Sequence, residues 1–321
     1  MSKHLRNQLL RLLLEQQSPY ISGEEISKQL GCSRAAIWKH VQELRNQGYE
    51  IEARSRNGYR LISKPDRIAP EEINFYLQTE VLGKEIRYYP AITSTQESAH
   101  QWALAGAKEG SLVIADQQTT GRGRLGTSWV SPAGTGIWMS LILRPNALLK
   151  FASHFTLLAA VSVFEAIQSL SSYPIHIKWP NDLLINKKKV CGILTELKGE
   201  QDRVDYMVIG IGLNVKQNDQ LPSHATSLEE AAGKQYIRAQ VIAQILQRIE
   251  LCYMEYVKEG FAPIRKRWEA GAQSFFGREV QAKTWNGVIK GIAEGLNDDG
   301  ALIIRSEGEK RIIYSADIQM T

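Results

Sequence analysis

The sequence predicts an α+β protein of several domains, and three observations lead to this prediction. Capped helices separated by a glycine turn lie near the start, apolar strands alternate with amphipathic helices through the middle, and short strands with Asn, Asp and Gly turns follow at the end. At 321 residues the chain is also too long for one typical core. We expect three domains, at residues 1–65, 66–274 and 275–321.

The first domain is predicted to be a helix-turn-helix. Leucines between positions 5 and 14 indicate one helix. Ser22 begins a second helix, with Glu25 completing a capping box, and Gly31 ends it before Ser33 caps a third. Two helices joined by a short turn that contains glycine are typical of DNA-binding domains whose last helix enters the major groove.

A basic hairpin is expected directly after the third helix. Apolar residues alternate with polar ones from 49 to 61, and Asn57-Gly58 between them is a strong hairpin signal. The hairpin would act as the wing of a winged helix-turn-helix and touch DNA phosphates. The residues expected to contact DNA are Ser33, Arg34, Ala35, Trp38, Lys39, Gln42 and Arg45 on the helix and Arg54 and Arg56 on the hairpin. A three-helix module that binds another protein is the alternative.

The distribution of charge favours DNA as the partner of this domain. Residues 1–65 hold 11 Lys and Arg against 6 Asp and Glu, whereas the rest of the chain holds 28 of each. The whole net charge of +5 therefore lies in the first domain. Such a basic segment on a neutral body is expected of a nucleic-acid-binding module.

Composition argues against several other classes of protein. Three widely spaced cysteines predict neither a disulfide framework nor a zinc site, and the six histidines lack metal-ligand spacing, so we expect no metal held by the protein itself. The longest apolar stretch, residues 155–164, is too short to span a membrane, and the N-terminus lacks a signal-peptide core. We therefore expect a cytoplasmic protein without a membrane partner.

The middle of the chain is predicted to be a mixed α/β domain, because its hydrophobic period switches repeatedly between strand and helix. Strands are expected at residues 86–89, 112–115, 137–143, 190–196 and 206–213, and helices at 94–105, 152–169 and 239–259.

A glycine- and arginine-rich loop at residues 121–126 follows the second of these strands. Its glycines let backbone N–H groups face an anion, and the guanidiniums of Arg122 and Arg124 grip the same oxygens as forks. The spacing also fits a dinucleotide-binding fingerprint, but no helix opens after it and Asn146 stands where an acidic residue is required. An ordinary solvated basic turn is the other interpretation.

Two further segments carry polar groups next to predicted strands. Lys178-Trp179-Pro180-Asn181-Asp182 is followed by three lysines, and we expect only Lys189 to reach a cleft, because it adjoins the strand. Lys187 and Lys188 are expected to form a solvated turn. In residues 210–215 glycine alternates with apolar residues, as in strands that a ligand approaches closely.

These motifs together resemble the biotin protein ligases. The resemblance rests on Ser94-Thr95-Gln96, Gln118 and residues 121–126, 178–182, 189–192 and 212–214, and with the first domain it extends to the bifunctional form that is also a biotin-operon repressor. It implies a ligase core similar to class II aminoacyl-tRNA synthetases, followed by a small SH3-like β-barrel at 275–321. The turns at Asn286-Gly287, 297–300 and Glu307-Gly308 fit such a barrel.

The resemblance implies two half-reactions, in which biotin and MgATP give bound biotinyl-5'-AMP and the biotinyl group then passes to a lysine of a biotin carboxyl carrier protein. The implied catalytic residues are Arg122, Arg124, Lys189 and Asp182, the last orienting or deprotonating the incoming amine. The implied ligand-binding residues are Ser94, Thr95, Gln96, Gln118, Arg122, Gly123, Arg124, Trp129, Lys189, Gly192 and Asn214. Trp129 offers a flat surface for adenine or belongs to the core. The tail, residues 318–321, is expected to make no ligand contact.

The arginine loop also suggests a switch. A glycine-rich loop with two like charges should be mobile when empty and ordered by an anionic adenylate, which would then favour a homodimer and operator binding. Biotinyl-AMP would thus be a corepressor. A lipoate or octanoate ligase is the enzymatic alternative, and a non-catalytic regulator that senses a small anion is the alternative of another class.

Overall fold

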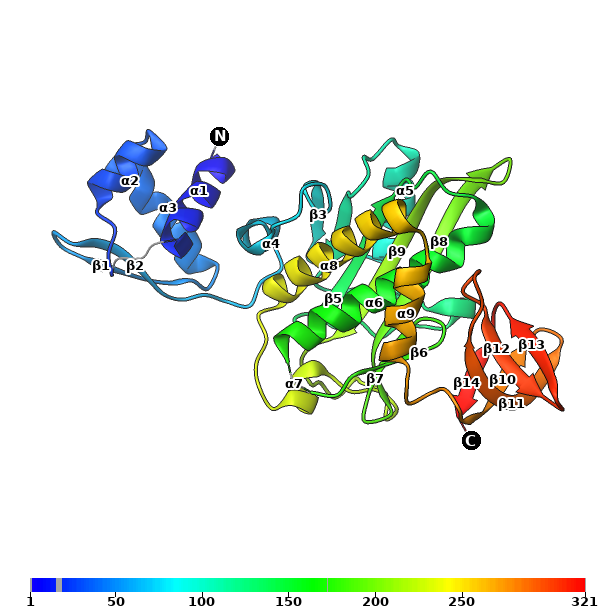
Figure 1. Ribbon diagram of the computed structural model, residues 1–321. Helices are drawn as coiled ribbons and strands as arrows, with labels where there is room; N and C mark the ends of the chain where they lie inside the picture. The colour runs from blue at the N-terminus through cyan, green and yellow to red at the C-terminus, as the bar shows by residue number, and fades with distance from the viewer. Residues whose placement is uncertain (1, 16–18, 172, 321) are drawn as a thin grey trace. The chain divides into compact units, whose positions relative to one another are not determined.

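The computed structural model describes residues 2–15, 19–171 and 173–320 (Figure 1). The chain divides into two compact units, Met1–Phe75 and Tyr76–Thr321, which are described separately below. The second unit contains both the mixed α/β region and the β-rich end that the sequence predicts.

The first unit contains helices α1 (Ser2–Glu15), α2 (Gly23–Leu30) and α3 (Arg34–Asn46). The predicted caps are confirmed: the Ser22 hydroxyl accepts the N–H of Glu25 at 3.0 Å, and the Ser33 hydroxyl accepts the N–H of Ala36 at 3.2 Å. Gly31 ends α2 in the left-handed conformation that favours glycine. The apolar faces of the three helices meet in one core of buried residues, including Leu9, Leu10, Ile26, Ile37, Val41 and Leu44.

The predicted hairpin is present as strands β1 (Glu50–Arg54) and β2 (Gly58–Ser63), but its turn differs from the prediction. Arg54 pairs with Gly58, so the turn holds residues 55–57 and the glycine is the first residue of β2. Gly58 has a φ of +106°, and a Cβ on it would lie 2.0 Å from the carbonyl oxygen of Ile21. Gly58 therefore allows its own backbone to pass close to the backbone of Ile21, and the Asn-Gly pair does not form a two-residue turn.

Replacing Gly58 by alanine is expected to destabilise the first unit by about 2–4 kcal/mol, since the new methyl group meets backbone and the φ is strained. Hydrogen exchange on the full chain should become faster in residues 19–63 and stay unchanged in the second unit. Gly31→Ala is the matched control, because its φ is also positive, +62°, but nothing lies within 4 Å of the new Cβ. Equal losses at both positions would contradict the crossing argument.

The second unit is built on a seven-stranded sheet in the order β3-β4-β5-β9-β8-β7-β6. Only β3 and β4 are parallel; the other neighbours are antiparallel. The strands are β3 (Ile86–Tyr89), β4 (Leu112–Ala115), β5 (Gly136–Leu143), β6 (His176–Lys178), β7 (Asp182–Ile185), β8 (Lys188–Glu200) and β9 (Arg203–Asn214). The five predicted strands are all present, whereas β6 and β7 lie outside the predicted set.

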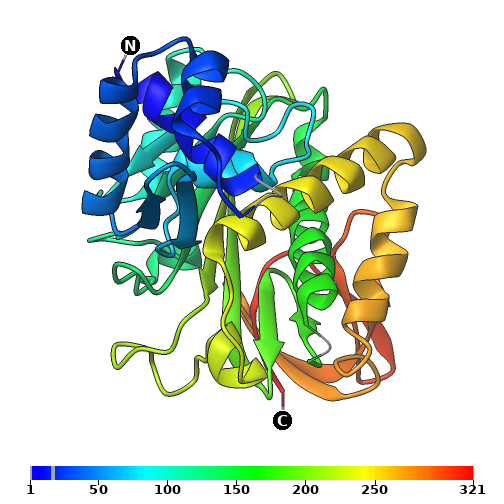
Figure 2. The ribbon, with the colours of Figure 1, turned by 90° about the vertical axis from the view of Figure 1, so that its left-hand side faces the viewer.

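Helices pack on this sheet (Figures 1 and 2). They are α5 (Thr95–Leu104), α6 (Ala152–Leu170), α8 (Arg238–Glu259) and α9 (Ala262–Gly271). The shorter helices α4 (Pro70–Tyr76) and α7 (Leu228–Ala232) lie elsewhere in the sequence. The long helices α6 and α8 lie side by side, and α5 places Ala99 and Ala103 against Val113 and Ile142 of the sheet. The three predicted helices match α5, α6 and α8 within two residues.

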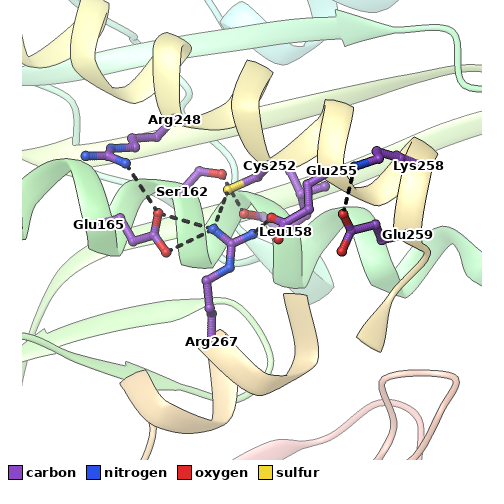
Figure 3. A network of polar contacts seen from close by, with 9 residues as sticks. All are labelled: Leu158, Ser162, Glu165, Arg248, Cys252, Glu255, Lys258, Glu259 and Arg267. Atoms are coloured by element: carbon purple, nitrogen blue, oxygen red, sulfur yellow. Dashed lines mark hydrogen bonds and ion pairs between the residues drawn. The ribbon is translucent and has the colours of Figure 1, made fainter. Parts of the chain in front are cut away.

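Ionic contacts connect α6, α8 and α9 (Figure 3). Arg267 of α9 lies 3.1 Å from Glu165 of α6 and also pairs with Glu255 of α8. Its guanidinium donates to the buried Cys252 sulfur at 3.5 Å, and Arg248 approaches Glu165 at 3.9 Å. Because α9 leads directly into the final strands, these contacts fix the position at which the last part of the chain begins.

Helix α6 is the most apolar helix. Together with the preceding turn it spans residues 149–170, in which an 18-residue window has a mean hydropathy of 1.3, so this segment is long and apolar enough to cross a membrane by length and composition alone. The apolar stretch 155–164 considered in the sequence lies inside this longer segment, whose averaged hydropathy includes polar residues on both sides of it. However, 61% of the apolar window is buried inside the protein, which is typical of a core helix.

The final part of the chain is a five-stranded antiparallel sheet in the order β13-β12-β11-β10-β14. Its strands are β10 (Glu279–Thr284), β11 (Gly287–Leu296), β12 (Leu302–Ser306), β13 (Glu309–Ile313) and β14 (Asp317–Met320). The predicted turns at 297–300 and at Glu307-Gly308 lie between these strands, and Glu307 and Gly308 both have positive φ, as a two-residue hairpin turn requires. The first turn is shifted by one residue to Trp285-Asn286, because Gly287 already pairs with Thr284 at the start of β11. The last strand returns to pair with β10.

Candidate functional site

A cavity of about 710 Å³ opens on the second unit where the ends of strands meet the arginine loop. All twelve residues of that unit singled out in the sequence lie on its wall: Ser94, Thr95, Gln96, Gln118, Arg122, Gly123, Arg124, Trp129, Asp182, Lys189, Gly192 and Asn214. They come from five separate segments of the chain, so the fold brings together residues that are more than 100 positions apart.

The part of the wall formed by α5 is polar and tightly hydrogen-bonded. The Gln118 side-chain oxygen accepts the backbone N–H of Thr95 at 2.8 Å and its hydroxyl at 3.0 Å. Gln96 accepts from Ser140 at 3.0 Å and donates to the Val208 carbonyl at 3.1 Å. These two amide side chains are held by the protein itself, which fixes the shape of this wall.

Ser94 differs from its neighbours. It stands at the N-terminus of α5, but its hydroxyl does not cap the helix. Ser94 is 1% exposed, and its hydroxyl oxygen has no hydrogen-bond partner in the protein. A buried polar group without a partner is costly, so a polar ligand in the cavity would satisfy it.

The arginine loop contains the short helical turn η1 (Arg124–Gly126). The guanidinium of Arg124 donates from Nη1 to the Asn181 side-chain oxygen at 3.2 Å and from Nη2 to the Ser315 hydroxyl at 2.9 Å. Burial lowers the pKa of Arg124, and the charges of Asp182 and Asp317 partly offset this. Arg122 is more exposed and lies 3.4 Å from Glu97.

The glycines of the loop accommodate the loop's own atoms in this structure. A Cβ on Gly121 would lie 2.4 Å from the Trp129 carbonyl oxygen, and one on Gly123 would lie 2.6 Å from the Thr127 hydroxyl. Leu125 and Gly126 have positive φ, which turns the chain sharply at the tip. Besides the expected exposure of backbone N–H groups to an anion, these glycines therefore also allow close packing within the loop.

Lys189 and Asp182 form an ion pair on the cavity wall, with 2.7 Å between Nζ and Oδ1. Asn186 and Lys187 make the two-residue turn between β7 and β8, both with positive φ. Lys187 and Lys188 are exposed at this turn, whereas Lys189 points into the cavity, 28% exposed. The three lysines thus lie as the sequence predicts. The turn before β7 holds residues 179–181, so Asp182 is already in the strand.

Trp129 lies on the cavity wall and not in the core. The Lys189 ammonium is 5.1 Å from its ring centroid. Gly192 and Gly212 are paired on β8 and β9, and a Cβ on either would lie within 3.0 Å of the indole. The ring thus packs on two adjacent glycines. The glycines of this strand were expected to allow close approach of a ligand, and in this structure the Trp129 indole lies against them. The indole N–H has no hydrogen-bond partner in the protein.

Two segments of the wall were missed in the sequence. Leu221, Pro222, His224 and Ala225 lie there because the backbone of Lys189 bonds to residues 224 and 226. Ala316, Asp317 and Ile318 also line the cavity, so the tail, for which the sequence predicts no ligand contact, reaches the cavity wall at Ile318. No local sequence signal marks either segment, because long-range pairing places them.

The first unit exposes most of the residues expected to contact DNA. Arg34, Ala35, Trp38 and Lys39 are exposed on α3, and Trp38 is 60% exposed. Ser33 uses its hydroxyl as the helix cap, and Gln42 is half-buried.

Three of the expected arginines differ in their surroundings. Arg45 does not face outward: its guanidinium donates to the Ile51 carbonyl at 3.0 and 2.5 Å, because position 45 follows Val41 by four residues and lies beside the apolar stripe. Arg54 pairs with Glu52 at 2.8 Å, and Arg56 is exposed in the hairpin turn.

Among the residues that the structure describes, no group of three or more His, Cys, Asp or Glu side chains is arranged to hold a metal ion. The carboxylates on the cavity wall are those of Asp182 and Asp317. Mg²⁺ commonly binds through one or two carboxylates together with substrate phosphates, so this donor set fits an ion that enters with a nucleotide.

Comparison with known proteins matches three family models to the chain. They are an HTH domain at residues 5–60, the biotin/lipoate A/B protein ligase family at 88–214 and the biotin protein ligase C-terminal domain at 275–320. The bifunctional ligase/repressor BirA of Bacillus spizizenii is 48% identical over all of both chains. That of Escherichia coli is 30% identical over 89% of this chain and 88% of its own length. The biotin protein ligase of Aquifex aeolicus in complex with biotin and ATP is 31% identical, with a TM-score of 0.66 over 74% of this chain and all of its own.

Proposed function

Because this chain belongs to the family of bifunctional biotin protein ligases and repressors, we propose that the cavity of its second unit is where biotin and ATP bind and react. The chain is a biotin protein ligase joined to a DNA-binding repressor module. The observation that carries the assignment of the site is the convergence of the Arg122 and Arg124 guanidiniums, the Lys189 ammonium and the unpartnered buried Ser94 hydroxyl on a single cavity.

The proposed chemistry has two steps. A carboxylate oxygen of biotin attacks the α-phosphorus of ATP, the bond to the β-phosphate oxygen breaks, and pyrophosphate leaves. The lysine amine of a biotin carboxyl carrier protein then attacks the carbonyl carbon of biotinyl-AMP, and AMP leaves as the amine loses a proton. Both steps move negative charge, so positioning and electrostatic stabilisation supply most of the catalysis.

We assign the charged residues to these oxygens. Arg124 and Arg122 hold carboxylate and phosphate oxygens as forks, and Lys189 exchanges its partner Asp182 for the α-phosphate. Asp182 would then be free to orient or deprotonate the incoming amine. Mg²⁺ would enter with ATP, with Asp182 and Asp317 as the available carboxylates, and would neutralise phosphate charge there.

The neutral residues would recognise biotin and the base. Ser94 donates to a polar atom of biotin, while Thr95, Gln96 and Gln118 shape that end of the cavity. Gly123, Gly192 and Asn214 line the same cavity, and Trp129 offers its ring to adenine.

We also propose the three-domain division at residues 1–65, 66–274 and 275–321, which is supported by the compact first unit and by the C-terminal family match at 275–320. The partners would be operator DNA, a biotin carboxyl carrier protein and a second copy of the chain, in the cytoplasm. Exposed Arg34, Lys39 and Arg56 would supply contacts with DNA.

One reaction mixture tests the enzymatic assignment. Purified protein with ATP, Mg²⁺, labelled biotin and a carrier domain should release pyrophosphate and label the carrier lysine. Lipoate that supports the reaction in place of biotin would favour the lipoate ligase alternative, and absence of pyrophosphate release would favour a non-catalytic regulator.

Biotinyl-AMP is expected to raise the affinity for operator DNA about tenfold or more by favouring a dimer, because two modules on one duplex combine their contacts. Binding of the intact protein to an operator selected from random duplexes, with and without biotin plus ATP at fixed salt, measures this effect. Deletion of residues 1–65 should abolish operator binding and preserve biotinyl-AMP synthesis. Equal affinities with and without ligand would refute the switch.

A further inference from the structure

A buried imidazole on α6 holds the loop between β11 and β12. His154 is 3% exposed and stacks on Phe261, with ring centroids 3.8 Å apart and an angle of 3° between the ring planes. Its Nε2 lies 3.0 Å from the Asp298 carbonyl oxygen, and its Nδ1 lies 3.1 Å from the Tyr256 hydroxyl. The neutral ring with its proton on Nε2 satisfies both contacts, because Nε2–H donates to the carbonyl and Nδ1 accepts the hydroxyl.

The same loop is held at three successive carbonyls. After Asp298, the Asp299 carbonyl accepts the Ser153 hydroxyl at 2.6 Å, and the Gly300 carbonyl accepts the Trp179 indole N–H at 3.3 Å. A Cβ on Gly300 would lie 2.7 Å from Leu157 of α6, so the loop is packed tightly against this helix. The loop thus docks the final sheet on α6 and on the turn that precedes β7.

That turn connects the docked loop to the arginine loop. Trp179 stands two residues before Asn181, whose side chain accepts Arg124 at 3.2 Å and donates to the Ile193 carbonyl at 2.6 Å. From the other end of the final sheet, Ser315 accepts the same guanidinium at 2.9 Å. The final sheet therefore helps to position the Arg124 guanidinium through two sets of contacts, one through Trp179 and Asn181 and the other through Ser315.

We propose that His154 is a positioning residue for the ligase reaction: in its neutral form it locks the 297–300 loop, and thereby holds Arg124 over the bound adenylate. Protonation favours release of the lock, because the charged ring would otherwise stay buried between Phe151 and Phe261. The proposal rests on the role of Arg124 given above, because the adenylate must be the ligand that Arg124 retains.

The surroundings of His154 favour the neutral ring. Burial lowers the pKa of His154, while the hydrogen bond to the Asp298 carbonyl and the charge of Asp299 raise it less. Arg265 of α9 neutralises the Asp298 carboxylate at 2.6 Å, and Lys150 lies over the Phe151 ring that stacks on the imidazole. The remaining titratable neighbour is the Tyr256 hydroxyl, which is neutral because burial raises its pKa.

The sign of the pH effect follows from this lowered pKa. The locked form is favoured fully above the ordinary histidine pKa of about 6.5. Below that pH the unlocked form binds protons better, so the ratio of locked to unlocked protein falls by up to about tenfold for each pH unit. Leakage of biotinyl-AMP through the unlocked form should therefore rise by up to about tenfold between pH 7.5 and 5.5.

Three forms of the full chain test the proposal through the dissociation rate of preformed biotinyl-AMP at pH 7.5 and 5.5. His154→Gln keeps a neutral donor near Nε2, so retention should be nearly the same at both pH values. His154→Leu removes the donor and should leak at both. The wild type should change from slow to fast leakage. His100→Gln is the matched control, since His100 contacts Glu196 and Tyr206 instead of the loop, and it should keep the wild-type profile.

Hydrogen exchange in residues 297–301 gives a second readout that does not depend on catalysis. At pH 5.5 the wild type should exchange faster than His154→Gln at the same pH, so that intrinsic exchange rates cancel. An identical pH dependence of retention in wild type and His154→Gln, or wild-type retention by His154→Leu at pH 7.5, would overturn the proposal. If the wild type forms no biotinyl-AMP at all, the assigned reaction fails, and the exchange comparison still decides whether His154 is a lock.

Discussion

Replacing Lys189 by alanine is expected to slow the formation of biotinyl-AMP by about 10²–10³-fold, because it removes a preorganised cation from the charge that develops on the α-phosphate. Lys189 is the lysine of its run that points into the cavity, held there by β8 and by its ion pair with Asp182 at 2.7 Å. Single-turnover formation of labelled biotinyl-AMP at saturating biotin and ATP measures the chemical step directly.

Lys187→Ala is the matched control for this variant. Lys187 is exposed at the turn between β7 and β8 and carries the same charge two residues away. Its loss should leave the rate of the chemical step nearly unchanged. Equal defects at the two positions would mean that the lysine run acts through a diffuse field, and the specific role of Lys189 would be wrong.

Replacing Arg124 by glycine is expected to speed the dissociation of biotinyl-AMP by about 10²-fold, because a half-buried charged fork is then lost from the bound state. Chasing preformed labelled biotinyl-AMP with unlabelled ligand gives this rate. The released mixed anhydride should also label lysines of unrelated proteins, which mass spectrometry detects.

Two companion variants separate the guanidinium from backbone freedom. Arg124→Ala removes the fork without adding a glycine, whereas Leu125→Gly adds a glycine at a position whose φ is already +55°. Fast dissociation in Arg124→Ala and slow dissociation in Leu125→Gly would support the role of the fork. The opposite pattern would show that loop mobility is the cause.

Local signals predict most of the fold. Ser22, Ser33 and Gly31 determine helix ends through contacts within a few residues, so their positions can be read directly from the sequence. The hairpin turn was predicted one residue too late in the chain. Gly58 is required by its close approach to the Ile21 backbone, which is far away in the sequence. The strands β6 and β7 were missed because their partners in the sheet stabilise them more than their own pattern does.

The candidate site shows the same limit. The arginine loop and Lys189 could be identified from residue type and spacing alone, since charges beside glycines or at a strand end have few structural uses. Ile318 and His224 could not, because only the pairing of distant segments brings them to the cavity. Arg45 was expected to face DNA because its charge suggested it, while its place beside the buried stripe of α3 directs it to the Ile51 carbonyl.

The indole of Trp129 and the two glycines beneath it have a consequence for how this sequence can vary. A Cβ on Gly212 would lie 2.6 Å from the indole, so Gly212→Ala alone should lower the stability of the fold. Gly212→Ala combined with Trp129→Ala removes this clash. The effects of the two substitutions on stability should be strongly non-additive. Positions 129, 192 and 212 are therefore expected to vary together, because the residues tolerated at one position depend on the residues at the other two.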